Sequence, residues 1–355
     1  MIQAPPESLR RVAGAVESRI EALLSGEVER WKATHPDLAE PLILLRNNVL
    51  SGGKRLRPAF CHWGFVAAGG DPSDPSIVDA GAALELLHSF AVLHDDVMDA
   101  SRLRHGEETV NYAHQTRHEA ARWSGEARRF GDGVAILVGD LAFVYADQLL
   151  VGISSEATEI YNELRLEVNL GQYLDLVGTA RRDSDLETTR RISLYKSGKY
   201  TVERPLHLGA ALAGRLSGSD GLGEALSAYG LAVGEAFQLR DDLLGAFGDP
   251  SITGKPVGED LREGKPTPLF ALAVSRATPA DVGSLDRLYG KADLAAPDIE
   301  ELRELLNRTG ARAAVEERIG ALVSDGVAAL REARLDGDAA TELEALARFV
   351  AERDH

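Results

Sequence analysis

The chain has 355 residues and a formal net charge of −17, from 56 acidic and 39 basic side chains. This acidic excess argues against a nucleic acid partner, because binding to nucleic acid phosphates relies on clustered Lys and Arg. The single cysteine, Cys61, excludes an intramolecular disulfide and is expected to pack in the core. The segment Met1–Pro6 does not read as a signal peptide, and no apolar run approaches the roughly 18 residues of a membrane span. We therefore expect a soluble cytoplasmic protein without a membrane span.

The length of the chain suggests two domains by the usual prior. No stretch of the sequence has the composition of a linker, however, and the acidic motifs found below would have to meet in space to act together. We therefore expect one all-α domain over residues 1–355, which is long enough to bury a sizeable core.

The N-terminal part contains a predicted helix and a basic turn. Residues 7–33 alternate Leu, Val, Ile and Ala with Glu and Arg at helical spacing, which predicts an amphipathic packing helix. In Leu50–Pro58 two glycines precede three cations, and Pro58 suits the first turn of a helix. A Gly-rich basic turn beside a helix start can hold phosphate; the alternative is a solvated basic turn.

A loop and an acidic helix end follow. Residues 67–77 are rich in Gly and Pro and predict a loop before a helix over about 78–100. That helix closes with Asp95, Asp96 and Asp99. Asp95 and Asp99 are four residues apart on one face, so their carboxylates repel unless a cation lies between them. Oxygen ligands suit Mg²⁺, which substrate phosphates often complete; the alternative is a solvated acidic helix end.

The middle of the chain contains a second acidic helix end. Residues 131–150 predict a mostly apolar helix, and residues 212–223 predict a loop rich in Gly and Ser. The next helix, over about 224–247, closes with Asp241 and Asp242. Two such helix ends could face each other across a core and hold a cluster of metal ions.

The residues around and after this motif extend the pattern. Gln238 lies one turn before Asp241 and is expected to point the same way. Residues from about 248 to 267 predict a long loop, which in a compact domain is usually a lid or a binding loop. Residues 269–355 return to amphipathic helices with Glu and Arg faces.

At these motifs the chain resembles the trans-isoprenyl diphosphate synthases, the polyprenyl synthetase family, and in particular its short-chain geranylgeranyl and farnesyl diphosphate synthases. The two aspartate-rich motifs of that family read DDxxD. Asp95–Asp99 matches the first motif completely, whereas Gly245 stands where the second motif should end in Asp. The resemblance covers about residues 40–275. It implies the isoprenoid synthase fold, a single large helical bundle with a central cavity.

The resemblance further implies a Mg²⁺-dependent enzyme that forms a homodimer. Its metal ligands would be Asp95, Asp99 and Asp241. Together with Lys196 and Gln238, these three aspartates would be the catalytic residues, and Asp242 would lie beside the substrate.

Several cations match positions that bind the two substrates in the family. The matching residues are Lys54 and Arg57 for the diphosphate of isopentenyl diphosphate, Arg104, Lys196 and Lys255 for the allylic diphosphate (dimethylallyl, geranyl or farnesyl), and Lys265 as a further lysine of the same motif. Arg55 lies between the first two and is expected to contribute. Lys199, three residues after Lys196, is expected at the surface.

Three polar residues near these motifs leave alternatives open. His88 shares the face of Asp95 and either packs in the core or reaches isopentenyl diphosphate, as this position does in the family. Asp175, in the motif Gly171–Asp175, either lies near the metals or makes a buried structural hydrogen bond. His105 replaces a family Arg that contacts isopentenyl diphosphate, and imidazole carries a full charge only when protonated. We expect this substitution to weaken binding of that substrate.

The implied reaction is chain elongation. Metal ions and cations stabilise the leaving allylic diphosphate, and the double bond of isopentenyl diphosphate attacks the resulting cation in an apolar tunnel. Two other functions remain open. A class I terpene cyclase shares the all-α fold and one DDxxD but lacks the Gly-Gly-Lys-Arg motif, and a non-catalytic partner subunit would account for Gly245 and His105.

Two residues before the first motif bear on product length. Phe90 and Ala91 lie five and four residues before Asp95. In the family, bulk at these positions closes the floor of the tunnel, and one aromatic at the fifth position goes with C20 products. The resemblance therefore implies geranylgeranyl diphosphate, with farnesyl or longer products as alternatives. Phe90 as an ordinary core aromatic is the other reading.

Overall fold

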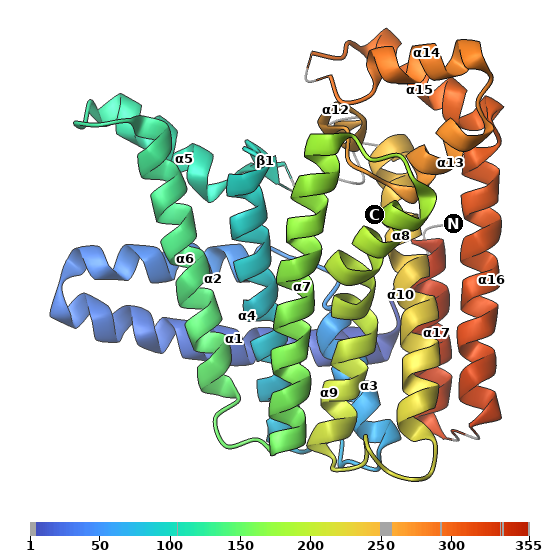
Figure 1. Ribbon diagram of the computed structural model, residues 1–355. Coiled ribbons are helices and arrows are strands. Elements are labelled where there is room, and N and C mark those ends of the chain that lie inside the picture. The colour runs from blue at the N-terminus through green and yellow to red at the C-terminus, as the bar shows by residue number, and fades with distance from the viewer. Residues whose placement is uncertain are drawn as a thin grey trace. The chain divides into compact units, whose positions relative to one another are not determined.

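The computed structural model describes residues 5–104, 106–248, 258–291, 293–333, 335 and 337–353 of the chain. Within them, the strands are β1 (Leu103–Arg104) and β2 (Glu107–Glu108), which pair antiparallel. All other regular structure in the described part is helical (Figure 1). The prediction of an all-α fold is confirmed.

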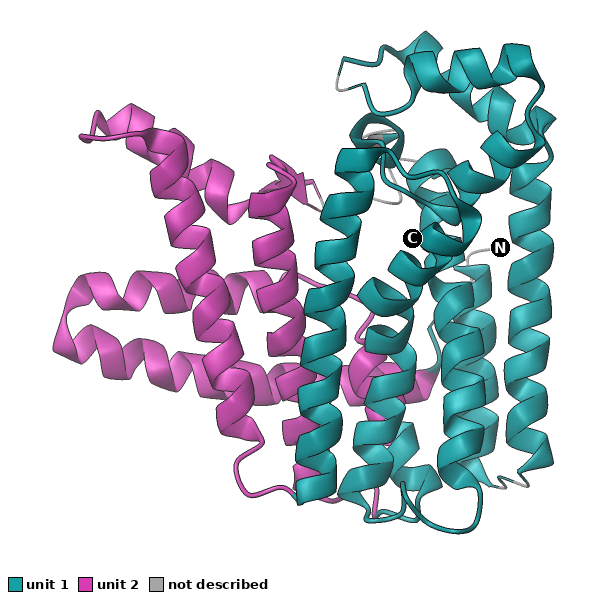
Figure 2. Cartoon of the chain, viewed as in Figure 1, with its two compact units in different colours: residues 1–6, 63–70, 154–355 teal, residues 7–62, 71–153 magenta. Residues whose placement is uncertain are grey.

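The chain folds into two compact units, drawn in different colours in Figure 2. Unit 1 comprises residues 1–6, 63–70 and 154–355, and unit 2 comprises residues 7–62 and 71–153. The helices of unit 2 are α1 (Glu7–Thr34), the 3₁₀ helix η1 (Pro36–Ala39), α2 (Glu40–Leu50), α4 (Pro75–Met98), α5 (Val110–Ala121) and α6 (Ala127–Leu149). Helix α3 (Leu56–Ala67) begins in unit 2 and ends in unit 1.

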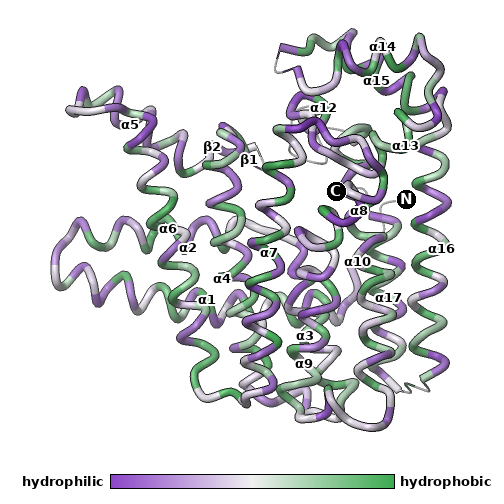
Figure 3. The backbone as a smooth tube through the Cα atoms, in the orientation of Figure 1, coloured by the Kyte–Doolittle hydropathy of each residue, from purple (hydrophilic) through white to green (hydrophobic). Residues whose placement is uncertain are grey.

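Helix α1 confirms the predicted amphipathic helix. Its buried residues recur every three or four positions, which is the spacing of one helix face. They are Ser8, Leu9, Val12, Val16, Ile20, Leu24 and Val28. Figure 3 shows the same alternation of hydrophobic and hydrophilic residues along α16.

Helix α4 carries the first aspartate motif, and half of its 24 residues are buried. It contacts α1, α2 and α6. The Asp74 side chain caps it by accepting a hydrogen bond from the Ser76 N–H at 2.8 Å, so the helix starts at Pro75, three residues before the predicted start. By length and composition alone α4 could cross a membrane, contrary to our expectation, but 61% of its apolar window is buried inside the protein. This burial is typical of a core helix.

The Gly-rich basic turn forms at the predicted place, beside the start of α3. Gly52 and Gly53 have φ values of 122° and 125°, which only glycine adopts without strain. Arg55 is buried and donates to Glu85 at 2.6 Å, to Glu17 at 2.9 Å and to the Val49 carbonyl at 2.7 Å. The expected contribution of Arg55 to phosphate binding is therefore wrong, because its guanidinium already forms hydrogen bonds to residues of α1, α2 and α4.

Unit 1 consists of helices in its described residues. They are α7 (Ser155–Arg181), α8 (Leu186–Ser193), the π-helix η2 (Leu194–Glu203), α9 (Arg204–Leu212), α10 (Leu222–Phe247), α12 (Glu259–Glu263), α13 (Pro268–Arg276), α14 (Pro279–Leu288), α15 (Ala296–Arg308), α16 (Ala311–Glu332) and α17 (Asp338–Glu352). The predicted loop over 212–223 and the helices after 269 are confirmed. The predicted long loop over 248–267 is partly wrong, since α12 lies within it; residues 249–257 are outside the described residues.

The π-helix η2 is held between α7 and α10 by close backbone contacts. A Cβ at Gly234 of α10 would lie 2.5–2.9 Å from backbone atoms of Gly198, which is closer than side chains tolerate. The same helix carries Lys199, which we expected at the surface. Instead its side chain is only 14% exposed and pairs with Glu167 of α7, which also accepts two hydrogen bonds from Arg204 at 2.6 and 2.8 Å. The expectation for Lys199 is wrong because Glu167 provides a buried counter-charge that periodicity does not reveal.

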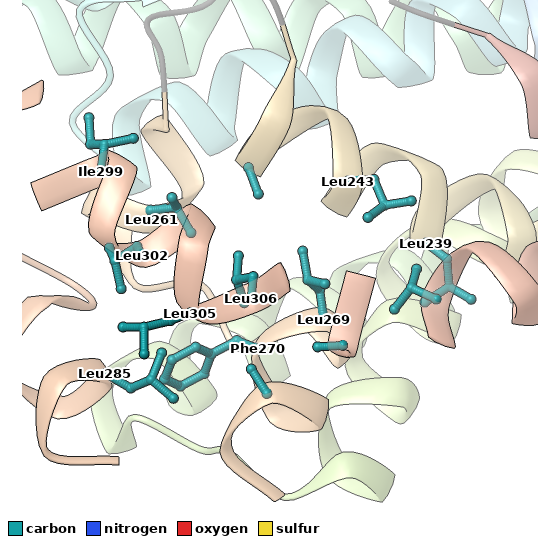
Figure 4. Packing of buried hydrophobic residues seen from close by; sticks show 14 of the residues in the cluster. Leu239, Leu243, Leu261, Leu269, Phe270, Leu285, Ile299, Leu302, Leu305 and Leu306 are labelled. Carbon is teal, nitrogen blue, oxygen red and sulfur yellow. The ribbon is translucent and has the colours of Figure 1, made fainter. Parts of the chain in front are cut away.

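An apolar cluster supports the end of α10. It joins Leu239 and Leu243 of α10 to residues of α12–α16, and Figure 4 shows part of this cluster. This packing fixes the C-terminal turn of α10, where the second aspartate motif lies. Cys61 is buried and not disulfide-bonded, as predicted.

Candidate active site

The first aspartate motif occupies the last turn of α4. Asp96 is buried and accepts a hydrogen bond from Arg104 Nε at 2.7 Å, while Arg104 Nη2 lies 3.4 Å from Asp95. Asp99 is the residue that closes the helix. Burial raises the pKa of the Asp96 carboxyl, Arg104 opposes this shift, and the neighbouring Asp95 and Asp99 add to it. Three carboxylates therefore gather at the negative end of the helix dipole, an arrangement that favours a cation.

Arg104 was predicted to hold the allylic diphosphate. Arg104 is the last residue of β1, and its guanidinium lies against Asp95 and Asp96. This position keeps Arg104 next to the motif and gives the buried Asp96 its counter-charge. His105, the next residue, lies outside the described residues.

The other predicted residues of unit 2 lie where the sequence placed them. Lys54 follows the glycine turn, and Arg57 is in the first turn of α3; both are half-buried. His88, also half-buried, is seven residues before Asp95 and shares its face of α4.

Phe90 and Ala91 are half-buried on α4. The Phe90 ring lies 4.5 Å from the ring of His94 and 4.9 Å from the ring of Phe143 on α6, measured between centroids. Phe90 is therefore packed between two helices, without the complete burial of a core aromatic.

The second aspartate motif occupies the last turns of α10. The Asp241 side chain is 39% exposed, whereas Asp242 is buried and accepts a hydrogen bond from Gln238 Nε2 at 2.9 Å. Gln238 thus pairs with Asp242, four residues on, whereas its spacing had predicted only that it points the same way as Asp241. Burial raises the pKa of the Asp242 carboxyl well above its usual value, and Asp260, Asp241 and Asp175 push it in the same direction.

Asp260 of α12 is a site residue that the sequence analysis missed. A Cβ built on Gly245 would overlap the Asp260 carboxylate. Asp260 and Asp242 also line one small cavity together with Thr267 and Tyr289. The Asp260 carboxylate thus occupies the space that a side chain at position 245 would fill, and the Gly at this position of the DDxxD pattern was the available signal for it.

Two lysines of unit 1 pair with acids. Lys196 Nζ of the π-helix η2 lies 2.6 Å from Asp175 of α7, which is buried. Asp175 thus makes a buried hydrogen bond that holds Lys196, and its charge also acts on Asp242 of the second motif, so both alternatives for Asp175 stay open. Lys265 lies 2.7 Å from Glu263, and its carbonyl accepts a hydrogen bond from Tyr289 Oη at 2.5 Å. Lys255 lies outside the described residues.

A second missed residue is Arg353, immediately after α17. Its guanidinium pairs with Asp241 and donates to the Phe237 carbonyl at 3.0 Å. It also lies over the Phe237 ring, 4.1 Å from the centroid. No sequence motif signals this contact, because 112 residues separate the two partners.

The acidic residues suit Mg²⁺, which keeps water and substrate ligands, better than a metal ion whose ligands all come from the protein. Among the described residues, no three acidic or histidine side chains converge closely enough to hold an ion unaided. Mg²⁺ keeps several waters and is usually completed by substrate phosphates, so one or two carboxylates from each motif suffice. Unit 2 offers Asp95 and Asp99, and unit 1 offers Asp241 and Asp260.

Comparison with known proteins extends these observations. Residues 42–306 match the polyprenyl synthetase family. The chain is 32% identical over 339 residues to a short chain isoprenyl diphosphate synthase of Methanothermobacter thermautotrophicus, covering 92% of this chain and 95% of the relative. It is 34% identical over 315 residues to a geranylgeranyl diphosphate synthase of Mycobacterium tuberculosis, covering 86% and 81%.

A solved structure agrees over nearly the whole chain. The geranylgeranyl pyrophosphate synthase of Corynebacterium glutamicum, crystallised with isoprenyl diphosphate and magnesium, superposes with a TM-score of 0.87 at 38% identity, over 95% of this chain and 98% of that protein. Other relatives carry the names of farnesyl, geranylfarnesyl and nonaprenyl diphosphate synthases, so likeness alone leaves the product length open. The fold, the two aspartate motifs and this match over most of the chain show that the protein belongs to the polyprenyl synthetase family of prenyltransferases.

Proposed function

We propose that the protein condenses an allylic diphosphate with isopentenyl diphosphate to give geranylgeranyl diphosphate, with release of diphosphate. The observation that carries this proposal is that each of two separate helix ends gathers carboxylates beside a cation. Asp95 and Asp96 lie with Arg104, and Asp241 lies with Arg353. Carboxylates beside a cation suit a magnesium diphosphate, because the carboxylates bind the Mg²⁺ and the cation binds the negatively charged diphosphate.

In this proposal Asp95, Asp99 and Asp241 hold Mg²⁺, and Asp260 adds a carboxylate to the second motif. Mg²⁺ would supply Lewis acidity at the diphosphate oxygens. Lys196, fixed by Asp175, neutralises the leaving diphosphate together with Arg104. Lys255, outside the described residues, is proposed for the same role from its sequence position, as is Lys265.

The protein residues also place the second substrate. Lys54, Arg57, His88 and His105 are proposed to hold the diphosphate of isopentenyl diphosphate, so that its double bond faces the allylic carbon. The allylic carbon–oxygen bond breaks, the new carbon–carbon bond forms, and the departing diphosphate takes the proton that is lost. Orientation of the two substrates supplies much of the rate.

We further propose a cytoplasmic homodimer. Helix α6 exposes Leu137 (62%) and Val144 (51%), seven residues apart on one face, and Val151 (83%) is exposed in the turn that follows the helix. An apolar stripe of this kind is typical of a helix that packs on another copy. Sedimentation of the protein with Val144→Asp and Leu137→Asp should show a shift to monomer, with Ile43→Asp, an exposed apolar residue of α2, as the matched control.

One assay separates the proposed activity from its alternatives. Diphosphate release is measured with Mg²⁺ and an allylic diphosphate, with and without isopentenyl diphosphate, and the product is separated by chain length. Release that requires both substrates and gives a C20 product supports the proposal. Release without isopentenyl diphosphate would indicate a cyclase, and no release would indicate a partner subunit. A C15 or longer product would correct the chain length alone.

A further inference from the structure

The ion pair between Arg353 and Asp241 joins the end of the last helix to the second aspartate motif. Arg353 is 1% exposed at its side chain, which is unusual for an arginine. Burial lowers the pKa of its guanidinium, and Asp241 opposes that shift. A buried charge of this kind requires a counter-charge, and Asp241 provides it.

The position of Arg353 is set by the docking of α17 on α10. Tyr229 of α10 is fully buried and donates to the Leu343 carbonyl of α17 at 2.6 Å. At the other end of the contact, Arg353 donates to the Phe237 carbonyl and lies over the Phe237 ring. The guanidinium is thus anchored to α10 independently of Asp241.

In the described part of the chain, Arg353 approaches Asp241 from one side. Arg353 contacts Oδ1, and the Asp241 side chain remains 39% exposed. A metal ion that binds this carboxylate must therefore do so beside a fixed positive charge. Two effects of Arg353 oppose each other, since the ion pair orients the carboxylate but its charge repels a divalent cation. The repulsion acts between the guanidinium and a divalent ion in a site partly shielded from water, where charge interactions are strong. Orienting Asp241 saves only the conformational entropy of one short side chain, so we expect the repulsion to be the larger effect.

We propose that Arg353 is a built-in counter-ion of the second aspartate motif, which weakens binding of a free metal ion at Asp241. This inference rests on the proposed role of Asp241 as a metal ligand. A metal ion that arrives with an anionic diphosphate carries less net positive charge and is repelled less. Arg353 therefore favours loading of the second motif by the metal–diphosphate complex over loading by the metal alone.

The test is binding of free Mn²⁺, followed by electron paramagnetic resonance without substrate. The full-length protein carries Asp95→Ala and Asp99→Ala, so that the second motif dominates the signal. Arg353→Gln should raise the Mn²⁺ affinity about tenfold by removing one charge. Arg353→Met removes the same charge and suits the contact with the Phe237 ring, so it serves if the Gln variant does not fold. Circular dichroism checks folding.

Two controls isolate the charge. Arg353→Lys keeps the charge, and Arg348→Gln changes an exposed arginine of α17 that pairs with Glu344; both should leave the Mn²⁺ affinity unchanged. Unchanged or weaker Mn²⁺ binding in folded Arg353→Gln or Arg353→Met would overturn the inference. Asp241→Asn distinguishes the two proposals: if it leaves Mn²⁺ binding intact, Asp241 is not a ligand and the proposed metal site itself is wrong.

Discussion

The carboxylate of Asp260 lies over Gly245 and fills the space that a side chain at position 245 would occupy. Gly245→Ala should therefore push Asp260 away from Asp242 and lower turnover by about tenfold or more, the usual range for misplacing a group at a reacting centre. Gly245→Asp, which completes the DDxxD pattern, should do the same and should not improve activity. Steady-state assays with both substrates check this.

The matched control for Gly245 is Gly320, an exposed helical glycine of α16. A Cβ there meets nothing within 4 Å, so Gly320→Ala should leave turnover unchanged and raise stability by roughly 0.4–1 kcal/mol. Full turnover in Gly245→Ala would mean that Asp260 has no part in the reaction.

Local patterns were sufficient to predict several of the long helices and the first motif. The three-to-four-residue spacing in residues 7–33 and the cluster at Asp95 are encoded within single helices, where periodicity and neighbouring charges are visible. The start of α4 was placed three residues late, because the capping side chain of Asp74 sets it rather than the apolar pattern.

Contacts between distant segments could not be predicted. Arg353 meets Asp241 and Lys199 meets Glu167 only after the helices pack, and no local spacing links these partners. Arg55 looked like part of a phosphate site, because sequence shows its charge but not its buried partner Glu85. For charged residues, the sequence therefore predicted which helix or turn carries the side chain, but not which residue it pairs with.

Asp95 and Asp99 are predicted to be essential to the reaction and dispensable for folding. Asp95→Ala should lower turnover by several orders of magnitude, because it removes a metal ligand, while helicity and melting stay near the parent values. Asp79→Ala is the control on the same helix: its ion pair with Arg19 is partly exposed, so turnover should persist and stability fall by at most about 1 kcal/mol. Near-parent turnover in Asp95→Ala would remove it from the metal site.

The buried His207 should make stability sensitive to acid. Burial first, and then Arg204 and Lys199, lower the pKa of His207 to about 4. Arg204 can only donate toward Nδ1, at 3.5 Å, so the neutral ring donates Nε2–H to Ser227 Oγ at 2.9 Å.

Since the pKa of His207 is lower in the folded than in the unfolded protein, the unfolded state gains a proton first as the pH falls. Stability should fall between about pH 6.5 and about 4, by up to roughly 3 kcal/mol from this residue. Chemical denaturation across this window should show a shallower acid loss for His207→Gln than for the parent. Equal slopes would contradict the assignment.

Glu167 is predicted to hold the π-helix η2 in place. Its side chain is 7% exposed and pairs with Lys199 and Arg204, so Glu167→Gln removes the counter-charge that these two largely buried cations share, and Lys199 keeps Glu203 at 3.8 Å. We expect a loss of about 3–5 kcal/mol in the free energy of unfolding. Glu159→Gln, an exposed change on the same helix α7, should cost almost nothing. A loss below about 1 kcal/mol for Glu167→Gln would show that the bridge is dispensable.

Product length should respond to Phe90 and Ala91. Phe90 lies five residues before Asp95, about 7.5 Å along the helix axis at the usual rise per residue. It is half-buried against His94 and Phe143, so truncation opens space beside α6. As a tunnel floor, Phe90→Ala should lengthen the product beyond C20, and Ala91→Phe, which adds bulk one residue nearer the motif, should shorten it.

The competing role for Phe90 is packing alone, and the two roles predict different outcomes. As packing, Phe90→Ala should destabilise by roughly 3–5 kcal/mol and leave the chain length of the product unchanged. Leu93→Ala is the matched control, because Leu93 is buried on the same helix at 1% exposure and should lose stability without altering the product. Products of all three variants are separated by chromatography after incubation with farnesyl diphosphate and isopentenyl diphosphate. Soluble, active Phe90→Ala that still stops at the parent length would show that Phe90 does not limit the growing chain.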